Sequence, residues 1–286
     1  MNNARFTPRI GYSEGMGKKR PILLAVLIVV AAGGVAWLAL RPAEPQEPIY
    51  QGKRLSVWLN DYELIGHGWD DADIKKDNEK VDEVVRQIGT NAIPTLFRML
   101  NATDSPLKKL KYLAHDHGIY DIKDTDYPSA LAQTFQAELA FRALGAEAKE
   151  VVPRLIEIYD RKPPGDDREL VARILGGIGP PASNAVPSLL RTVANGGRIW
   201  SSIRALGEIH AEPAKVVPVL KKLLKDADDE VRKESIVALQ AFGADARPAV
   251  PALVELLTDH LDYVRKHAAQ ALKVIDPTAA TKAGVQ

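Results

Sequence analysis

A short motif that recurs five times constrains the fold of this chain more than any other feature. In each copy an apolar residue and glycine are followed by a short turn, and then by a small or β-branched residue, proline, any residue and leucine. The prolines are Pro94, Pro153, Pro187, Pro218 and Pro251, and the last four are almost evenly spaced along the chain. Their period, a little over thirty positions, is typical of solenoids built from stacked helix pairs. The first interval is almost twice as long, which predicts an insertion that holds one further helix pair or a long loop.

Each copy of the motif predicts two helices. The glycine supplies the left-handed conformation that ends the first helix, and the proline lies in the first turn of the second helix, where its missing N–H costs nothing. Aromatic residues make up only 6% of the chain, so the core consists mainly of aliphatic side chains such as Leu253. One helix pair cannot bury its apolar side alone, so neighbouring pairs must stack. We therefore predict an all-α fold, an α-solenoid over residues 49–286 with an insertion at about 101–130.

Four further segments carry a family resemblance. Asp229-Glu230-Val231-Arg232 and Asp262-Tyr263-Val264-Arg265 share the pattern D-x-V-R and lie one repeat period apart. Residues 48–59 read PIYQGKRLSVWL, and residues 275–277, Ile-Asp-Pro, are followed by Ala279 and Ala280. These features resemble membrane-anchored bacterial proteins with HEAT-like repeats of the phycobilisome-lyase type. The resemblance covers residues 48–286 and implies the solenoid fold, but it leaves the function open.

The repeated aspartates and arginines have a structural interpretation. An aspartate near a helix N-terminus accepts hydrogen bonds from free N–H groups and complements the helix dipole. We expect Arg232 and Arg265 to pair with carboxylates of adjacent repeats. A catalytic Asp/Arg pair is the alternative, but a feature that recurs at the stacking period favours a structural role.

Residues 21–40 predict a transmembrane helix. No charged residue interrupts these twenty positions, and Arg20 and Arg41 bracket them. At about 1.5 Å per residue such a helix spans about 30 Å, the thickness of a bilayer core. A cleavable signal peptide would have a shorter apolar region and a small-residue cleavage site, and a buried helix of this length would have a polar face.

The distribution of Lys and Arg predicts the orientation of this span. Residues 1–20 hold five Lys or Arg residues and are expected to stay in the cytoplasm. Residues 41–48 contain three prolines and form a linker that holds the body off the bilayer. The chain is thus predicted to be a single-pass membrane protein with an extracytoplasmic body, which in a bacterium lies in the periplasm.

Composition excludes several function classes. The chain has no cysteine, which rules out disulfides, thiolate metal sites and a cysteine nucleophile. Residues 42–286 carry 32 basic and 36 acidic residues, so nucleic acid is not an expected partner. No nucleophile-elbow, zinc-protease or phosphate-loop motif is present. We accordingly assign no catalytic residue and no cofactor.

Two stretches rich in acidic or histidine residues are candidate metal sites. His115 and His117 could share a divalent ion with Asp121 or Asp124. The acidic residues at 70, 71 and 73 lack the glycine and terminal glutamate of a calcium loop. Neither stretch shows a full ligand set, so no metal ligand is assigned.

The leading functional hypothesis is a non-catalytic scaffold that binds another protein. In this hypothesis the stacked second helices form an extended ridge, and the curvature of the solenoid makes a groove that suits a protein or peptide partner. The alternatives are an enzyme or enzyme accessory related to lyase-like HEAT proteins, and a metal or heme sensor that depends on His115 and His117.

The predicted partner contact lies in the insertion. The repeat period closes without residues 104–127, and this segment combines lysines with amphipathic side chains suited to partner contact. The candidate partner-binding residues are Tyr112, His115, His117, Tyr120 and Tyr127. The alternative is an insertion that only caps or widens the first repeats.

Overall fold

The computed structural model divides the chain into two compact units, Met1–Gln46 and Glu47–Gln286. The structure describes residues 46–62, 72–104, 129–161, 166–196 and 199–285. All elements discussed below belong to the second unit.

The second unit consists mainly of α-helices, as the sequence predicts. They are α2 (Leu55–Leu59), α3 (Ala72–Ile88), α4 (Ile93–Leu100), α6 (Ala130–Leu144), α7 (Val152–Arg161), α8 (Asp166–Ile178), α9 (Val186–Asn195), α10 (Trp200–Ile209), α11 (Pro213–Leu223), α12 (Asp229–Ala241), α13 (Val250–Glu255), α14 (Asp262–Ile275) and α15 (Pro277–Lys282). Short 3-10 helices connect them: η1 (Gly89–Ala92), η2 (Gly145–Val151), η3 (Pro180–Ala185), η4 (Gly243–Ala249) and η5 (Leu256–Thr258). The all-α prediction missed a small antiparallel hairpin, β1 (Ile49–Tyr50) and β2 (Lys53–Arg54).

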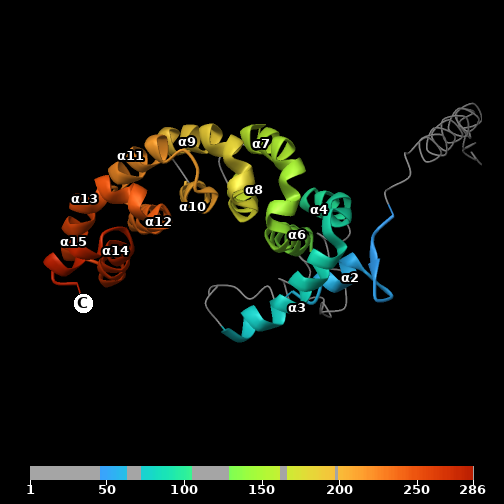
Figure 1. Cartoon of the computed structure of the whole chain (residues 1–286). Helices are drawn as coiled ribbons and strands as arrows, with labels where there is room; N and C mark the ends of the chain where they lie inside the picture. The colour runs from blue at the N-terminus through green and yellow to red at the C-terminus, as the bar shows by residue number, and fades with distance from the viewer. Residues whose placement is uncertain (1–45, 63–71, 105–128, 162–165, 197–198, 286) are drawn as a thin grey trace, which may run out of the picture. The chain divides into compact units, whose positions relative to one another are not determined.

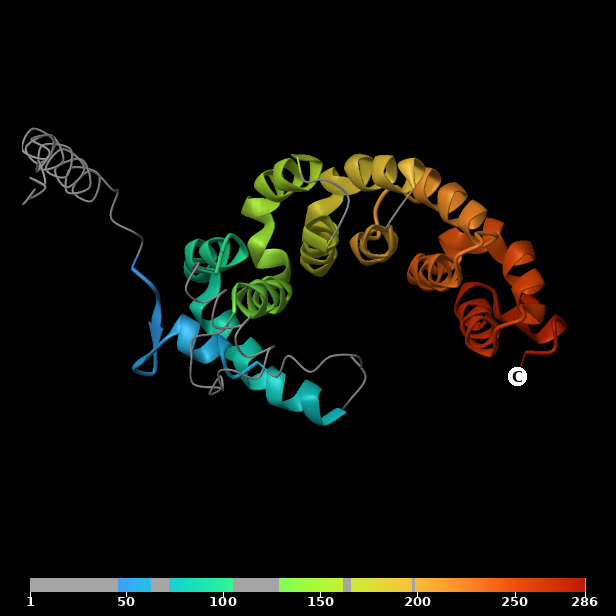
Figure 2. The ribbon, with the colours of Figure 1, turned by 180° about the vertical axis from the view of Figure 1, so that it is seen from behind.

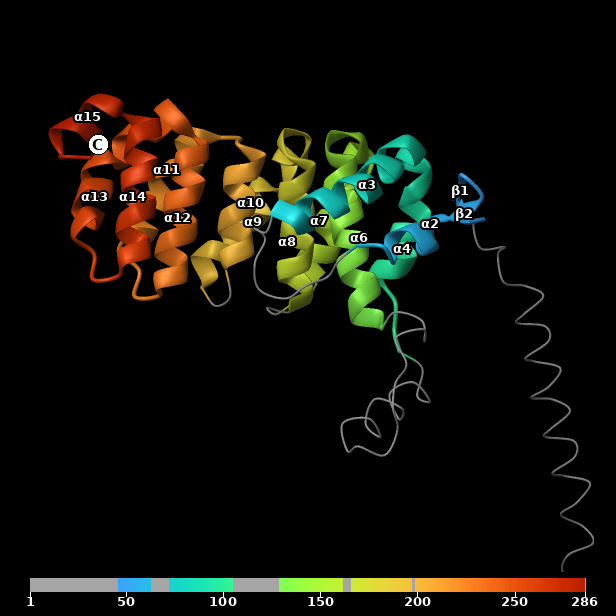
Figure 3. The same cartoon turned by 90° about the horizontal axis from the view of Figure 1, so that it is seen from below.

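The helices of the second unit form two rows (Figures 1 and 2). The first helices of successive repeats, α6, α8, α10, α12 and α14, form an inner row, and Figure 3 shows them side by side. The second helices, α4, α7, α9, α11 and α13, form an outer row. The predicted ridge of second helices is therefore the outer row, and the inner side of the curve belongs to the first helices.

Small residues explain why the first helices form the inner row. A Cβ atom added to Gly207 of α10 would lie only 2.7 Å from the Cα of Ala238 on α12. A Cβ atom added to Gly176 of α8 would lie 3.1 Å from the Cα of Ala205 on α10. Because no side chain separates these backbones, the helices of this row approach closely. The row with the closer spacing is the shorter one and therefore lies inside the curve.

Glycines end most of the first helices as predicted. The residues Gly89, Gly145, Gly179 and Gly243 have positive φ angles and follow the ends of their helices. Gly207 is the exception, because it lies inside α10 and serves helix packing instead. The left-handed residue after α10 is His210, with φ of 51°. In the fourth copy the motif therefore predicts the turn correctly, but it assigns the left-handed conformation to Gly207 instead of His210.

Prolines begin most of the second helices as predicted. Helices α4, α9 and α13 each have proline at the first or second position, and α7 begins Val152-Pro153. The fourth copy differs again, since α11 begins at Pro213 and Pro218 lies in its interior. His210 and Glu212, both with positive φ, turn the chain within a few residues and allow the earlier start.

The core lies between the two rows and is mainly aliphatic. Leu253 on α13 is fully buried, which confirms its predicted core position. Leu155, Leu189 and Leu220 occupy the same second-helix position in the preceding copies and are also fully buried. The stacking of second helices against first helices therefore follows the register of the motif.

The ends of the predicted insertion lie next to each other. The backbone amide of Ala130 donates a hydrogen bond of 3.0 Å to Oδ1 of Asp104. Helix α6 starts at Ala130, and its N-cap Ser129 accepts a hydrogen bond from the amide of Ala132. Residues 105–128 lie outside the described residues.

Candidate partner-binding face

Two arginines on the inner row are held by buried carboxylates of neighbouring helices. Arg173 on α8 donates from Nε and Nη2 to Glu138 on α6 at 2.6 and 2.8 Å. Arg204 on α10 donates from the same two atoms to Glu234 on α12 at 3.0 and 2.7 Å. Bidentate pairs of this kind fix the plane of the guanidinium group. The two arginines are thus pre-oriented before any partner arrives.

The third nitrogen of each guanidinium remains available. Nη1 of Arg173 and Nη1 of Arg204 make no hydrogen bond to any residue that the structure describes, and these side chains are 22% and 40% exposed. The hydrogen bonds that Arg204 donates to Glu234 raise the pKa of Arg204 further, so this group stays charged at any physiological pH. Each Nη1 can therefore donate to a carbonyl or carboxylate oxygen of a bound protein segment.

A third arginine bridges two helices across α8. Nη2 of Arg142 on α6 lies 3.3 Å from Oε1 of Glu208 on α10, and its Nη1 donates to the carbonyl oxygen of Arg173 at 3.3 Å. The glycine pair of α8 makes room for this bridge. A Cβ atom at Gly176 would lie 2.2 Å from Oε2 of Glu208, and one at Gly177 would lie 2.4 Å from Cγ of Arg142. The repeat motif does not reveal this role, because its third copy contains Gly179 but neither Gly176 nor Gly177.

The charges of the inner row balance one another. Lys233 on α12 pairs with Glu230 on the same helix and lies 3.3 Å from Glu234. Burial alone would lower the pKa of Lys233, but these two carboxylates outweigh it and raise that pKa. Arg142, Arg173, Arg204 and Lys233 thus each have a carboxylate partner. Such a face lacks the excess positive charge that a nucleic-acid surface needs.

Exposed apolar side chains lie on the same row. The guanidinium of Arg173 lies over the ring of Phe135 on α6, with 6.0 Å between its Cζ atom and the ring centre. The side chain of Phe135 is partly exposed. Val237 on α12 and Val274 on α14 are 38% and 51% exposed. Apolar side chains between oriented polar groups are typical of surfaces that bind other proteins.

The arginines of the two D-x-V-R segments have structural roles. Nη1 of Arg232 donates to the carbonyl oxygens of Asp226 and Ala227, at the end of the preceding turn, at 3.0 and 3.2 Å. Its Nη2 donates to Asp259 of the next repeat at 3.3 Å, which confirms the expected pairing between repeats.

The equivalent Arg265 differs, because its carboxylate partner is Asp262 in its own segment. The residue that caps α12 is Asp228, whose side chain accepts from the amides of Glu230 and Val231, and not Asp229 of the motif.

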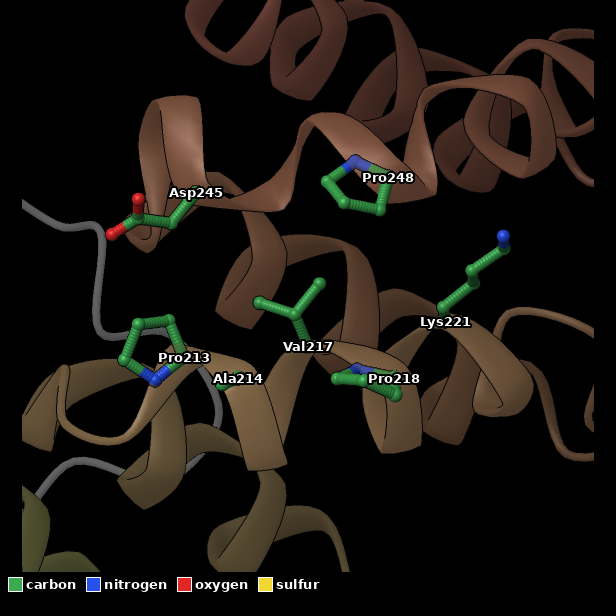
Figure 4. A pocket seen from close by; sticks show the side chains of 7 residues that line it. All are labelled: Pro213, Ala214, Val217, Pro218, Lys221, Asp245 and Pro248. Carbon is green, nitrogen blue, oxygen red and sulfur yellow. The ribbon is translucent and has the colours of Figure 1, made fainter.

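The outer row carries a shallow groove of about 530 Å³ between α11 and η4 (Figure 4). Its lining residues are Pro213, Ala214, Val217, Pro218, Lys221, Asp245 and Pro248. The buried Val217 forms the floor, and the charged ends of Lys221 and Asp245 lie apart from each other in Figure 4. A groove with a proline-rich wall and no converging polar groups lacks the features of a catalytic site.

The sequence-predicted partner residues Tyr112, His115, His117, Tyr120 and Tyr127 all lie outside the described residues, so they remain predictions. Over the parts of the chain that the structure describes, no three His, Asp or Glu side chains are arranged to hold a metal ion. Within those same parts, no helix is long and apolar enough to cross a membrane. The predicted span at residues 21–40 is not among them.

Comparison with known proteins gives one family match. Residues 199–273, from α10 to α14, match the family model described as HEAT repeats. No curated protein matches the chain.

Solved structures that are similar to the chain include designed repeat proteins. One is a designed armadillo repeat protein in complex with the peptide (KR)4, with 14% identity, a TM-score of 0.42, and coverage of 78% of this chain and 100% of that one. An engineered protein has 21% identity, a TM-score of 0.39, and coverage of 80% and 71%. The family match to residues 199–273 supports a HEAT-repeat domain in this part of the chain.

Proposed function

We propose that this chain is a membrane-anchored scaffold, of bacterial origin, that binds a protein partner along the inner row of its HEAT repeats. The pre-oriented Arg173 and Arg204 carry the proposal, since each keeps Nη1 available on a row that also holds exposed apolar side chains, with Phe135 beside Arg173. A donor fixed in place loses little conformational entropy when it binds. The inner row therefore suits an extended or helical protein segment with exposed oxygen acceptors and one or more apolar side chains.

The balanced charge of the face supports a protein partner over a polyanion. Arg173, Arg204 and Lys233 are each paired with glutamates of the same row. A bound segment would gain hydrogen bonds and apolar contacts without strong long-range attraction. We accordingly expect the affinity to depend only weakly on salt.

Residues 21–40 supply the proposed anchor, and the basic residues 1–20 supply its orientation. A single-pass anchor confines the inner row to the membrane surface and raises its local concentration for any partner bound there. The proposed compartment for the body is the extracytoplasmic space.

The orientation has a direct test. A reporter enzyme fused after Gln286 should be active when it requires export, and inactive when it requires the cytoplasm. The reverse pattern of activity would refute the proposed location of the body.

The binding face is tested by two matched substitutions. Val237 on the inner row and Val254 on the outer row are 38% and 36% exposed, so Val237→Asp and Val254→Asp add the same charge at similar cost in stability. We expect Val237→Asp to weaken partner recovery from detergent extracts by about tenfold, which corresponds to about 1.4 kcal/mol. We expect Val254→Asp to leave recovery unchanged. Equal recovery by both variants would show that the inner row is not the binding face.

A further inference from the structure

The N-terminal hairpin of the second unit, β1 and β2, has one face that the fold leaves open. Its turn residues Gln51 and Gly52 both have positive φ, 50° and 77°, which is the geometry of a tight two-residue hairpin turn. Ile49 pairs with Arg54, and Tyr50 pairs with Lys53. Paired residues of an antiparallel hairpin project to the same side. Ile49 and Arg54 therefore share one face, and Tyr50 and Lys53 share the other.

The Tyr50/Lys53 face packs on Trp58 of α2 and fixes the hairpin. The rings of Tyr50 and Trp58 meet edge to face at 6.4 Å, and Nζ of Lys53 lies 4.5 Å from the centre of the indole. The indole Nε1 donates to the carbonyl oxygen of Tyr50 at 3.0 Å. The Ile49/Arg54 face consequently points away from α2, and Ile49 is 69% exposed.

The charge around this face is positive. Glu47 is the only carboxylate of residues 47–57, and its side chain is turned inward. It accepts a hydrogen bond from the amide of Ser56 and pairs with Arg98 on α4. The hairpin thus presents an exposed isoleucine and an exposed arginine, Arg54, without a neighbouring exposed carboxylate in this segment.

We propose that the Ile49/Arg54 face rests on the bilayer, with Ile49 among the lipid headgroups and Arg54 on the phosphate of an anionic lipid. The inference rests on the proposed anchor at residues 21–40. Ile49 follows the end of that span by only a short linker, so the hairpin lies within about 30 Å of it. A membrane contact made by two side chains is weak by itself. The short linker to the proposed anchor, however, keeps the hairpin close to the bilayer. The hairpin would then hold the first repeats against the membrane.

The absence of cysteine allows a clean test on the full chain. Ile49→Cys and, as the matched control, Val254→Cys on α13 each create a single labelling site. Both variants carry the same environment-sensitive fluorophore and are reconstituted into vesicles of phosphatidylcholine with phosphatidylglycerol. Quenching by brominated lipids then reports contact with the bilayer. We expect quenching at position 49 to be several-fold stronger than at position 254.

The electrostatic part of the proposal is tested in the same system. In the Ile49→Cys background, Arg54→Ser should reduce the quenching several-fold, while Lys222→Ser on α11 should leave it unchanged. Pure phosphatidylcholine vesicles, or a rise from about 0.1 to about 1 M salt, should have the same effect as Arg54→Ser, because the Debye length falls from about 10 to about 3 Å.

Three results would overturn the proposal. If the chain floats with the vesicles but position 49 is quenched no more than position 254, the anchor is right and the hairpin contact is wrong. If position 49 is shielded from aqueous iodide without lipid quenching, protein covers this face instead. If the chain does not float with the vesicles at all, the anchor is wrong and the hairpin inference falls with it.

Discussion

Replacing Arg232 with methionine is expected to lower the free energy of unfolding of residues 47–286 by about 3–5 kcal/mol, as the loss of one partner from a buried ion pair does. Arg232 and Asp259 are only 7% and 8% exposed, and Nε of Arg232 lies 3.1 Å from Oδ2 of Asp259. The substitution also leaves the carbonyl oxygens of Asp226 and Ala227 without their donor. Urea titration followed by circular dichroism measures the loss.

Arg265→Met is the matched control, because Arg265 occupies the same motif position in the next repeat but is 37% exposed. It donates to the carbonyl oxygen of Asp259 at 2.7 Å. The loss of this hydrogen bond should cost about 1 kcal/mol. If Arg232→Met and Arg265→Met lowered the free energy of unfolding equally, the structural role assigned to the buried Arg232–Asp259 pair would be contradicted.

The pH dependence gives an independent check of the same pair. Burial raises the pKa of Asp259, but the amide of Leu261 and the guanidinium of Arg232 outweigh it and hold that pKa below its usual range. A carboxylate of this kind stabilises the fold above its unfolded pKa and loses that contribution as the pH falls. The difference between the wild type and Arg232→Met should therefore shrink below about pH 4.

Leu253→Ala is expected to lower the free energy of unfolding by about 2–5 kcal/mol, the range for a buried leucine whose loss leaves a cavity. Leu253 is fully buried on α13, whereas its neighbour Val254 is exposed. Val254→Ala should change the same free energy by less than about 0.5 kcal/mol. If Leu253→Ala had no measurable effect, the assigned repeat register would be wrong.

The local elements of this fold could be predicted from the sequence because their signals are local. The Val-Pro pairs at 152–153, 186–187 and 250–251 mark the starts of α7, α9 and α13. The fourth copy misled the prediction, because Gly207 packs against Ala238 of the next repeat and does not end its helix. Nothing within the motif distinguishes a glycine needed for a turn from one needed for close packing.

The inner row was not predicted because its contacts join different repeats without a fixed spacing. Arg173 pairs with Glu138, 35 positions before it, while Arg204 pairs with Glu234, 30 positions after it. The two pairs run in opposite directions along the chain, so no single offset in the sequence reveals them. Which helices form the inner row likewise depends on how closely their backbones approach one another. The spacing of apolar residues along a helix does not specify that distance.

Site-specific photo-crosslinking tests the central claim, binding along the inner row, most directly. The full chain, expressed in cells, would carry a photoreactive phenylalanine at Val237 on α12 or at Val254 on α13, which are similarly exposed on opposite rows. A discrete partner protein is expected to be crosslinked at position 237 and not at position 254. Crosslinking of the same partner at position 254, with none at position 237, would contradict it.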